Sequence, residues 1–133
     1  MNRVIDIGIR LNPNVDAKTI KEITTGKTSN KFGLTEKEVI RLIKHNKKSK
    51  YLNIKCLSVH IGSQITSHIP YLKMLKAIQK IIDKAKFNFE YIDIGGGMGI
   101  NYGVNKQKLN YKKYSNQIAK FVKKNKSTCM FCS

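Results

Sequence analysis

Apolar residues change their spacing back and forth along this chain, between the two-residue period of a strand and the 3.6-residue period of a helix. Strand-like stretches occupy residues 4–11, 54–60 and 89–94, and helix-like stretches occupy residues 35–47, 70–86 and 111–124. Strands that alternate with helices in this way are parallel and are joined by crossover connections. The residues therefore predict an α/β fold, either an open doubly wound sheet or part of a (β/α) barrel.

Local signals mark the helix starts and the first loop. Thr35 is followed three residues later by Glu38, the pattern of a capping box, and Pro70 suits the first turn of the next helix. Pro13, between two asparagines, ends the first strand. A polar loop then runs to Gly33, so the first strand and the first helix are joined by a long connection.

The composition limits the number of domains and the class of partner. A chain of 133 residues holds one domain, and its formal net charge of +18 is typical of proteins that bind polyanions. However, 23 of the 26 basic residues are Lys, whereas phosphate and guanine recognition favours Arg. The accompanying 18 Ile and 12 Asn residues indicate the coding bias of an AT-rich genome. We expect a solvated lysine surface and no specific nucleic-acid partner.

Neither a membrane segment nor a metal site is predicted. The apolar runs are shorter than the roughly 20 residues of a membrane-spanning helix, and Asp6 falls where a signal peptide would be apolar. We therefore expect a cytoplasmic protein without a membrane partner. Cys56 suits the core of a strand. Cys129 and Cys132 have redox or metal spacing, but no second pair accompanies them, so we assign them no function.

Unusual residues gather where the predicted strands end. His60, Ser63 and the glycines at 95, 96 and 97 follow the second and third strands, and Arg10 lies at the end of the first. Carboxyl ends of parallel strands are where such folds bind ligands. Consecutive glycines leave backbone N–H groups accessible to an anion, Ser63 adds a hydroxyl donor, and the His60 ring can stack on an aromatic ligand. Together these residues predict a site for a planar, phosphorylated ligand.

Each of these residues also has a purely structural interpretation. A histidine at a strand end is often a structural residue, and three glycines often make a tight turn. The run GGGMG also lacks the GxGxxG spacing of a dinucleotide-binding turn. The prediction of a ligand site therefore rests on the combination of residues at neighbouring strand ends.

Three blocks of the chain resemble a known family. RLNPNVDAKTIKEITTGKTSNKFGL, SVHIGSQIT and YIDIGGGMGINY are similar to successive blocks of the alanine racemase-like decarboxylases that use pyridoxal phosphate. The match runs in order from about Val4 to Val122. HIGSQ and the glycine triplet occur in looser forms in ornithine and arginine decarboxylases, and their combination with TTG and NKFG most resembles the diaminopimelate branch.

The resemblance implies a fold and a set of partners. We expect a partial (β/α)8 TIM barrel of about three βα units, which in the full-length family is followed by a β-domain and forms a homodimer. Residues 1–125 correspond to the middle of the pyridoxal-phosphate-binding barrel domain, and residues 126–133 form a divergent tail that a frameshift would explain. Residues 31–33 belong to a loop at the barrel mouth, for which the resemblance gives no chemical role.

The resemblance also implies roles for the strand-end residues. His60 stacks on the pyridine ring of the cofactor, pyridoxal 5'-phosphate. Ser63, Gly95, Gly96 and Gly97 hold its phosphate. Arg10 supports the hydrogen-bond network beneath the cofactor.

The family reaction converts meso-diaminopimelate, a small amino-acid substrate, to L-lysine and carbon dioxide. The family's Schiff-base lysine lies upstream of the block that contains Met1, so no catalytic residue is transferred to this chain. A Glu-Pro-Gly-Arg block is also replaced by KNKSTCMFCS. We expect a fragment that is inactive alone. An ornithine or arginine decarboxylase relative and a non-catalytic remnant that binds pyridoxal phosphate or phosphate remain as alternatives.

Overall fold

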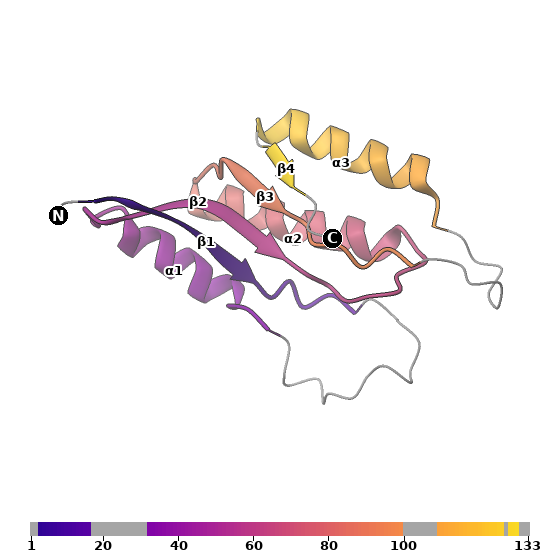
Figure 1. Ribbon diagram of the computed structural model, residues 1–133, viewed down its shortest axis with the longest axis horizontal. Coiled ribbons are helices and arrows are strands. Elements are labelled where there is room, and N and C mark those ends of the chain that lie inside the picture. Colours follow the sequence, from indigo (N-terminus) through magenta and orange to yellow (C-terminus); the bar gives the residue numbers. More distant parts are fainter. Residues whose placement is uncertain (1–2, 17–31, 100–108, 127, 131–133) are drawn as a thin grey trace.

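The computed structural model describes residues 3–16, 32–99, 109–126 and 128–130. Four strands and three helices alternate along these residues (Figure 1). In chain order they are β1 (Ile5–Leu11), α1 (Glu36–Asn46), β2 (Leu52–Val59), α2 (Ile69–Ala85), β3 (Tyr91–Asp93), α3 (Tyr111–Asn125) and β4 (Thr128–Met130).

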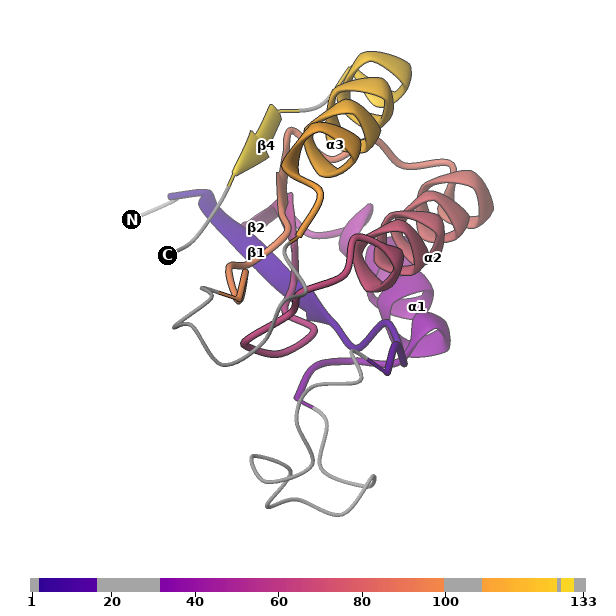
Figure 2. The same cartoon turned by 90° about the vertical axis from the view of Figure 1, so that its right-hand side faces the viewer.

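The strands form one parallel sheet in the order β1-β2-β3-β4. All three helices lie on the same side of this sheet, as Figure 2 shows. A doubly wound sheet reverses its strand order and carries helices on both faces, whereas a (β/α) barrel keeps sequential order with every helix outside. The arrangement therefore has the topology of a barrel segment, and the predicted fold class is confirmed.

The core lies between the sheet and the helices. Alternate residues of each strand face the helices, and residues three or four apart along each helix face the sheet. Leu57 and Val59 in β2 and Ile92 in β3 are fully buried there, as are Val39 and Ile43 of α1. The adjacent strand residues Ser58 and Asp93 are only partly buried. Polar side chains thus remain at the carboxyl edge of the sheet while the apolar set is shielded from water.

At the opposite, amino-terminal edge, a lysine of β2 lies near carboxylates of β1 and of the residue before β3. The Lys55 ammonium lies 3.0 Å from Asp6 in β1 and 3.4 Å from Glu90, which precedes β3. Lys55 donates hydrogen bonds to both carboxylates. The bond to Asp6, and to a smaller extent the bond to Glu90, raises the pKa of Lys55 above its ordinary value. All three side chains are at least one-third exposed, so the ion pairs contribute little to stability.

The tail contains an element that the sequence did not predict. Thr128–Met130 forms β4 and pairs in parallel with β3, with Thr128 opposite Tyr91. Three residues are too few to show a period of apolar residues, so β4 has no detectable signal in the sequence. Cys129 lies within β4, and Cys132 lies outside the described residues. The extent predicted for β3, residues 89–94, is also longer than the observed strand.

None of the helices in the described part of the chain is long and apolar enough to cross a membrane.

The start of α1 supports a first prediction, that Thr35→Ala lowers the free energy of unfolding by about 1 kcal/mol. The Thr35 hydroxyl accepts a hydrogen bond from the Glu38 N–H, and the Thr35 N–H donates to the Glu38 carboxylate at 2.7 Å. Alanine leaves the first of these N–H groups without its acceptor. Urea denaturation at pH 7 measures the change, and Ser115→Ala, a hydroxyl removed from the interior of α3, serves as the near-neutral control.

Acid should remove part of this stabilisation. Hydrogen bonds from the Thr35 backbone N–H and then from its hydroxyl hold the pKa of Glu38 below its ordinary value of 4.5. The folded state therefore gains stability that is complete above pH 4.5 and is lost as the pH falls through the lowered pKa. An effect of Glu38→Ala on the free energy of unfolding that stays the same from pH 7 to pH 2 would contradict this assignment of the cap.

Candidate functional site

The loops that follow β2 and β3 are joined to each other by backbone hydrogen bonds. The Ile65 N–H donates to the Gly97 carbonyl at 2.9 Å, and the Gly99 N–H donates to the Ile65 carbonyl at 3.0 Å. These bonds make an isolated parallel bridge between Ile65 and Met98. The Ile65 side chain is buried and anchors the bridge in the core. The two stretches singled out in the sequence, HIGSQIT and GGGMG, therefore form one structural unit.

The close approach of these loops requires glycine. Gly97 has φ of +87°, and a Cβ added to it would lie 1.9 Å from the Gly62 carbonyl oxygen. Gly95 has φ of +65°, and its Cβ would lie 2.8 Å from both His60 Nδ1 and the Val59 carbonyl oxygen. No side chain fits at such distances, and positive φ is unfavourable for other residues. The His60 ring therefore lies directly against the glycine turn.

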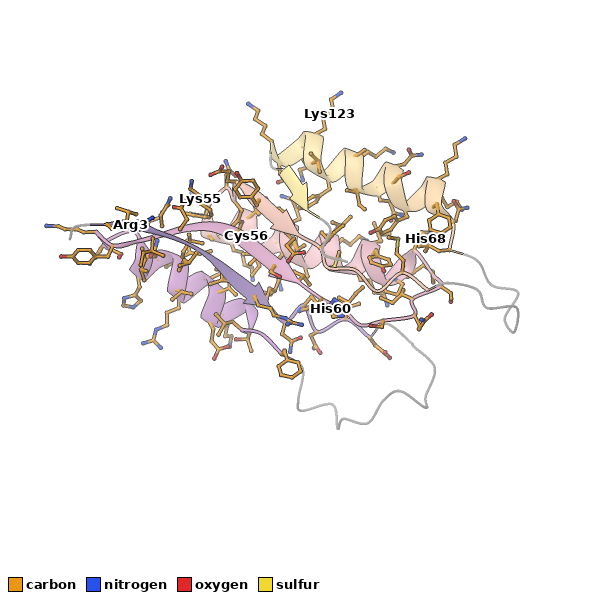
Figure 3. All side chains as sticks on the ribbon, viewed as in Figure 1. Arg3, Lys55, Cys56, His60, His68 and Lys123 are labelled. Atoms are coloured by element: carbon orange, nitrogen blue, oxygen red, sulfur yellow. The ribbon has the colours of Figure 1, made fainter. Side chains whose placement is uncertain are left out.

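A cavity of about 460 Å³ opens at this carboxyl edge of the sheet. Figure 3 places His60 beyond the tip of β2, with Lys55 and Cys56 further back along the strand. Every residue that the sequence placed in the site lines the cavity, together with three that it did not. The complete lining is Arg10, Ser58, Val59, His60, Ser63, Asp93, Gly95, Gly96 and Gly97.

Backbone and hydroxyl donors remain for a ligand in this cavity. The Gly95 N–H already donates to Asp93 Oδ1 at 2.8 Å, so it is not one of them. Within the described part of the chain, the N–H groups of Gly96 and Gly97 and the hydroxyl of Ser63 have no acceptor. Such a cluster of N–H and O–H donors on a glycine turn is the arrangement that binds phosphate oxygens.

A buried tyrosine contacts the glycine turn from the side of the core. The Tyr71 hydroxyl donates to the Gly96 carbonyl at 3.4 Å, and its ring meets Tyr114 of α3 edge-on with centroids 4.7 Å apart. Burial raises the pKa of Tyr71 well above its ordinary value, so the hydroxyl keeps its proton. This contact holds the Gly96 carbonyl on the core side of the turn. The residue pattern does not predict Tyr71 near the site, because an aromatic residue at this position is typical of the apolar face of any helix.

Arg10 is the cation of the cavity, and it is held by the loop that returns to β1. The Leu34 N–H donates to the Arg10 carbonyl at 2.7 Å, and the Arg10 guanidinium lies over the Phe32 ring, 5.7 Å from its centroid. Gly33, with φ of +105°, permits this close return. Phe32 and Gly33, two residues of the predicted barrel-mouth loop, therefore lie at the end of β1. The third, Lys31, lies outside the described residues.

Other features of the described residues do not form an alternative site of comparable chemistry. A larger open groove of about 840 Å³ lies between α1 and α2, and its Glu36 pairs with Lys80 and Lys84 at 2.7 Å. No strand-end residue lines that groove. Within residues 3–16, 32–99 and 109–126 no group of three or more His, Cys, Asp or Glu side chains is placed to hold a metal ion.

Known proteins match this chain in sequence and in structure. The family model of the pyridoxal-binding domain of pyridoxal-dependent decarboxylases matches residues 1–130. Diaminopimelate decarboxylase of Helicobacter pylori is 40% identical over 102 residues, which are 72% of this chain and 24% of that protein. The corresponding enzyme of Aquifex aeolicus is 37% identical over 99 residues, with the same coverage of both chains.

Solved structures agree with the sequence matches. Helicobacter pylori diaminopimelate decarboxylase, solved with L-lysine, superposes with a TM-score of 0.82 at 31% identity, over 97% of this chain and 33% of that one. The enzyme of Methanocaldococcus jannaschii gives a TM-score of 0.75 at 27% identity, over 97% and 32% of the two chains. This chain thus spans about a quarter of the curated relatives and a third of these structures.

The family predicted from the three sequence blocks is confirmed by these matches, and so is pyridoxal phosphate as the family's cofactor. The barrel topology, the glycine turn at the strand ends and the match over residues 1–130 agree with one another. The chain belongs to the pyridoxal-dependent decarboxylases and represents part of their pyridoxal-binding domain.

Proposed function

We propose that this chain is the part of a diaminopimelate decarboxylase that binds the phosphate and one ring face of pyridoxal phosphate. The observation that carries the proposal is the strand-end cavity, in which His60, Ser63 and the glycine turn come together. Their donors suit a phosphate and the His60 ring suits a pyridine. Similarity to diaminopimelate decarboxylases supports the choice of this branch over the ornithine and arginine enzymes.

The residues that line the cavity fit the chemistry of the cofactor. Ser63, Gly96 and Gly97 would hold the phosphate, and His60 would cover the ring. Glycine at positions 95 and 97 lets the two loops pack closely around the cavity, because a side chain at either position would collide with the neighbouring loop. When bound, the cofactor supplies an electron sink for decarboxylation. The contribution of this chain is to bind and orient that group.

The activity proposed for the whole protein is removal of carbon dioxide from meso-diaminopimelate, giving L-lysine. A homodimer in the cytoplasm is the proposed setting. No lysine of this chain is assigned to the covalent anchor, because none of them lies in the sequence context of the family's Schiff-base lysine. A non-catalytic module that binds pyridoxal phosphate or phosphate is the second candidate, favoured by the same cavity.

We predict that the 133-residue chain binds pyridoxal phosphate with a dissociation constant of about 0.1 to 1 mM, equivalent to about −4 to −5.5 kcal/mol. The proposed phosphate donors and the histidine proposed to stack on the ring line the cavity, and the covalent anchor is not assigned. Titration followed by phosphorus NMR measures the affinity. Binding weaker than 10 mM would contradict the proposal that the cavity is a cofactor site.

A companion assay separates binding from catalysis. Incubation of the purified chain with pyridoxal phosphate and meso-diaminopimelate is expected to release no more carbon dioxide than the free cofactor does. No residue assigned here forms the covalent link or returns a proton to the product. Robust formation of L-lysine would show that another lysine of this chain takes the missing role, and borohydride reduction followed by mass spectrometry would identify it.

A further inference from the structure

We infer that Asp93 is the positioning residue of the phosphate-binding turn, that Ser58 orients it, and that the Gly95 N–H serves this contact and not the ligand. The inference rests on the proposed function, since it names the residues that shape the same site. Neither Asp93 nor Ser58 touches the ligand in this account. Both act through the conformation of the turn.

The hydrogen bonds of Asp93 form a short relay between two strands. Ser58 in β2 donates its hydroxyl to Asp93 Oδ2 at 2.8 Å. Asp93 Oδ1 accepts the Gly95 N–H, also at 2.8 Å, from two residues further along the chain. The three residues line the cavity, and Ser58 and Asp93 are partners in the parallel register of β2 and β3. Both carboxylate oxygens are therefore engaged in setting the backbone of the turn.

This relay decides which way the glycine amides point. An aspartate that binds the N–H two residues ahead stabilises a turn in place of a continuing strand. β3 accordingly ends at Asp93, and Gly95 takes φ of +65°. The following N–H groups of Gly96 and Gly97 are then left without acceptors in the described part of the chain. Without Asp93 the chain would lose the contact that keeps the N–H groups of Gly96 and Gly97 directed away from the hydrogen bonds of the sheet.

A positioning role explains why a negatively charged side chain lies beside a proposed phosphate site. An unengaged carboxylate would repel an anionic ligand, which makes Asp93 costly unless its geometry is needed. If position matters and charge does not, asparagine should serve as well, because its side-chain oxygen accepts the Gly95 N–H and its amide donates to the Ser58 hydroxyl. This difference between shape and charge provides the test.

The experiment compares four variants of the full chain: Asp93→Asn, Asp93→Ala, Ser58→Ala and the control Asp83→Asn. Asp83 is an exposed residue of α2 that bonds to Gln79, so its replacement makes the same charge change away from the cavity. Two quantities are measured for each: hydrogen exchange at the Gly95 amide without ligand, and the affinity for pyridoxal phosphate.

We expect Asp93→Ala to accelerate Gly95 exchange at least tenfold and to weaken cofactor binding at least tenfold. Asp93→Asn should keep exchange within threefold of the wild type and bind the cofactor equally well or more tightly. Ser58→Ala should accelerate exchange and weaken binding two- to fivefold, and Asp83→Asn should change neither quantity.

Equal losses in Asp93→Asn and Asp93→Ala would overturn the inference, because the charge and not the position would then matter. Unchanged Gly95 exchange in Asp93→Ala would overturn it as well. If Asp93→Ala does not fold, the Ser58→Ala variant provides the test. Gly95 amide exchange in that variant equal to that of the wild type would reject the relay. The exchange measurement needs no ligand, so a wild-type chain that fails to bind pyridoxal phosphate would reject the proposed function while the relay is still tested.

Discussion

Replacing Gly97 with alanine is expected to lower the free energy of unfolding by about 2 to 4 kcal/mol and to abolish cofactor binding. The new Cβ would lie 1.9 Å from the Gly62 carbonyl oxygen, and the φ of +87° is itself unfavourable for alanine. The two loops would have to separate. That separation breaks the hydrogen bonds that Ile65 makes to Gly97 and Gly99, and the cavity loses its shape.

A matched glycine outside the site controls for the general effect of the substitution. Gly8 lies in β1, where the atom nearest to its added Cβ would be the Cys56 Cβ at 3.3 Å, and Gly8→Ala should change the free energy of unfolding by less than about 1 kcal/mol. Urea denaturation measures both variants. Similar small effects at Gly97 and Gly8 would show that the two loops are not held in the contact described here.

His60→Ala and Ser63→Ala are each expected to weaken the binding of pyridoxal phosphate by roughly 1 to 2 kcal/mol, about five- to thirtyfold. The reasons differ. In the proposed site the first substitution removes the ring that would cover the pyridine, and the second removes the hydroxyl that would donate to the phosphate. Fluorescence or phosphorus NMR titrations of the two variants measure these losses.

The different reasons give different selectivity for pyridoxal, which lacks the phosphate. His60→Ala should weaken the binding of both compounds, whereas Ser63→Ala should weaken that of pyridoxal phosphate alone. His68→Ala and Ser115→Ala are the controls, because neither residue lines the cavity (Figure 3 labels His68). Adducts on exposed lysines would survive both site substitutions. Unchanged affinity in both variants would therefore place the bound cofactor somewhere else on the chain.

The sequence was informative wherever a repeated pattern or a backbone constraint was involved. Helical spacing located all three helices, and the capping box at Thr35 is present as predicted. The fold class followed from the alternation of strands and helices, but the choice between a barrel and a doubly wound sheet did not. That choice depends on the order of strands and on the side occupied by each helix, which the residues leave open unless the family resemblance is used.

The candidate site was predicted in part. Arg10, His60, Ser63 and the glycines at 95–97 stood out because each is unusual at the end of a strand, and the structure places them around one cavity. Whether they bind the cofactor stays a prediction. Tyr71 had no signal, because the contact of its hydroxyl with Gly96 depends on how α2 packs. Asp93 did have a signal in the sequence, because a carboxylate within the apolar stretch YIDI needs a hydrogen-bond partner when it is buried.

The role of the glycine run also changes once the structure is known. The sequence suggested three equivalent glycines with accessible N–H groups. The structure divides them, because Gly95 donates to Asp93 while Gly96 and Gly97 keep their donors. Hydrogen bonds between side chains and the backbone at a strand end depend on the exact φ and ψ of the turn, and such angles are not readable from residue type alone.

We propose that the strand-end cavity recognises the phosphate of pyridoxal phosphate. The most direct measurement is the ratio of the affinities of the wild-type chain for pyridoxal phosphate and for pyridoxal, at physiological salt. Both aldehydes react with surface lysines, and the Ser63→Ala comparison separates recognition in the cavity from attraction of the phosphate to the basic surface. We predict a ratio of at least ten, about 1.4 kcal/mol, that falls several-fold in Ser63→Ala. Equal affinities for the two compounds, or a ratio that Ser63→Ala leaves unchanged, would contradict phosphate recognition by this cavity.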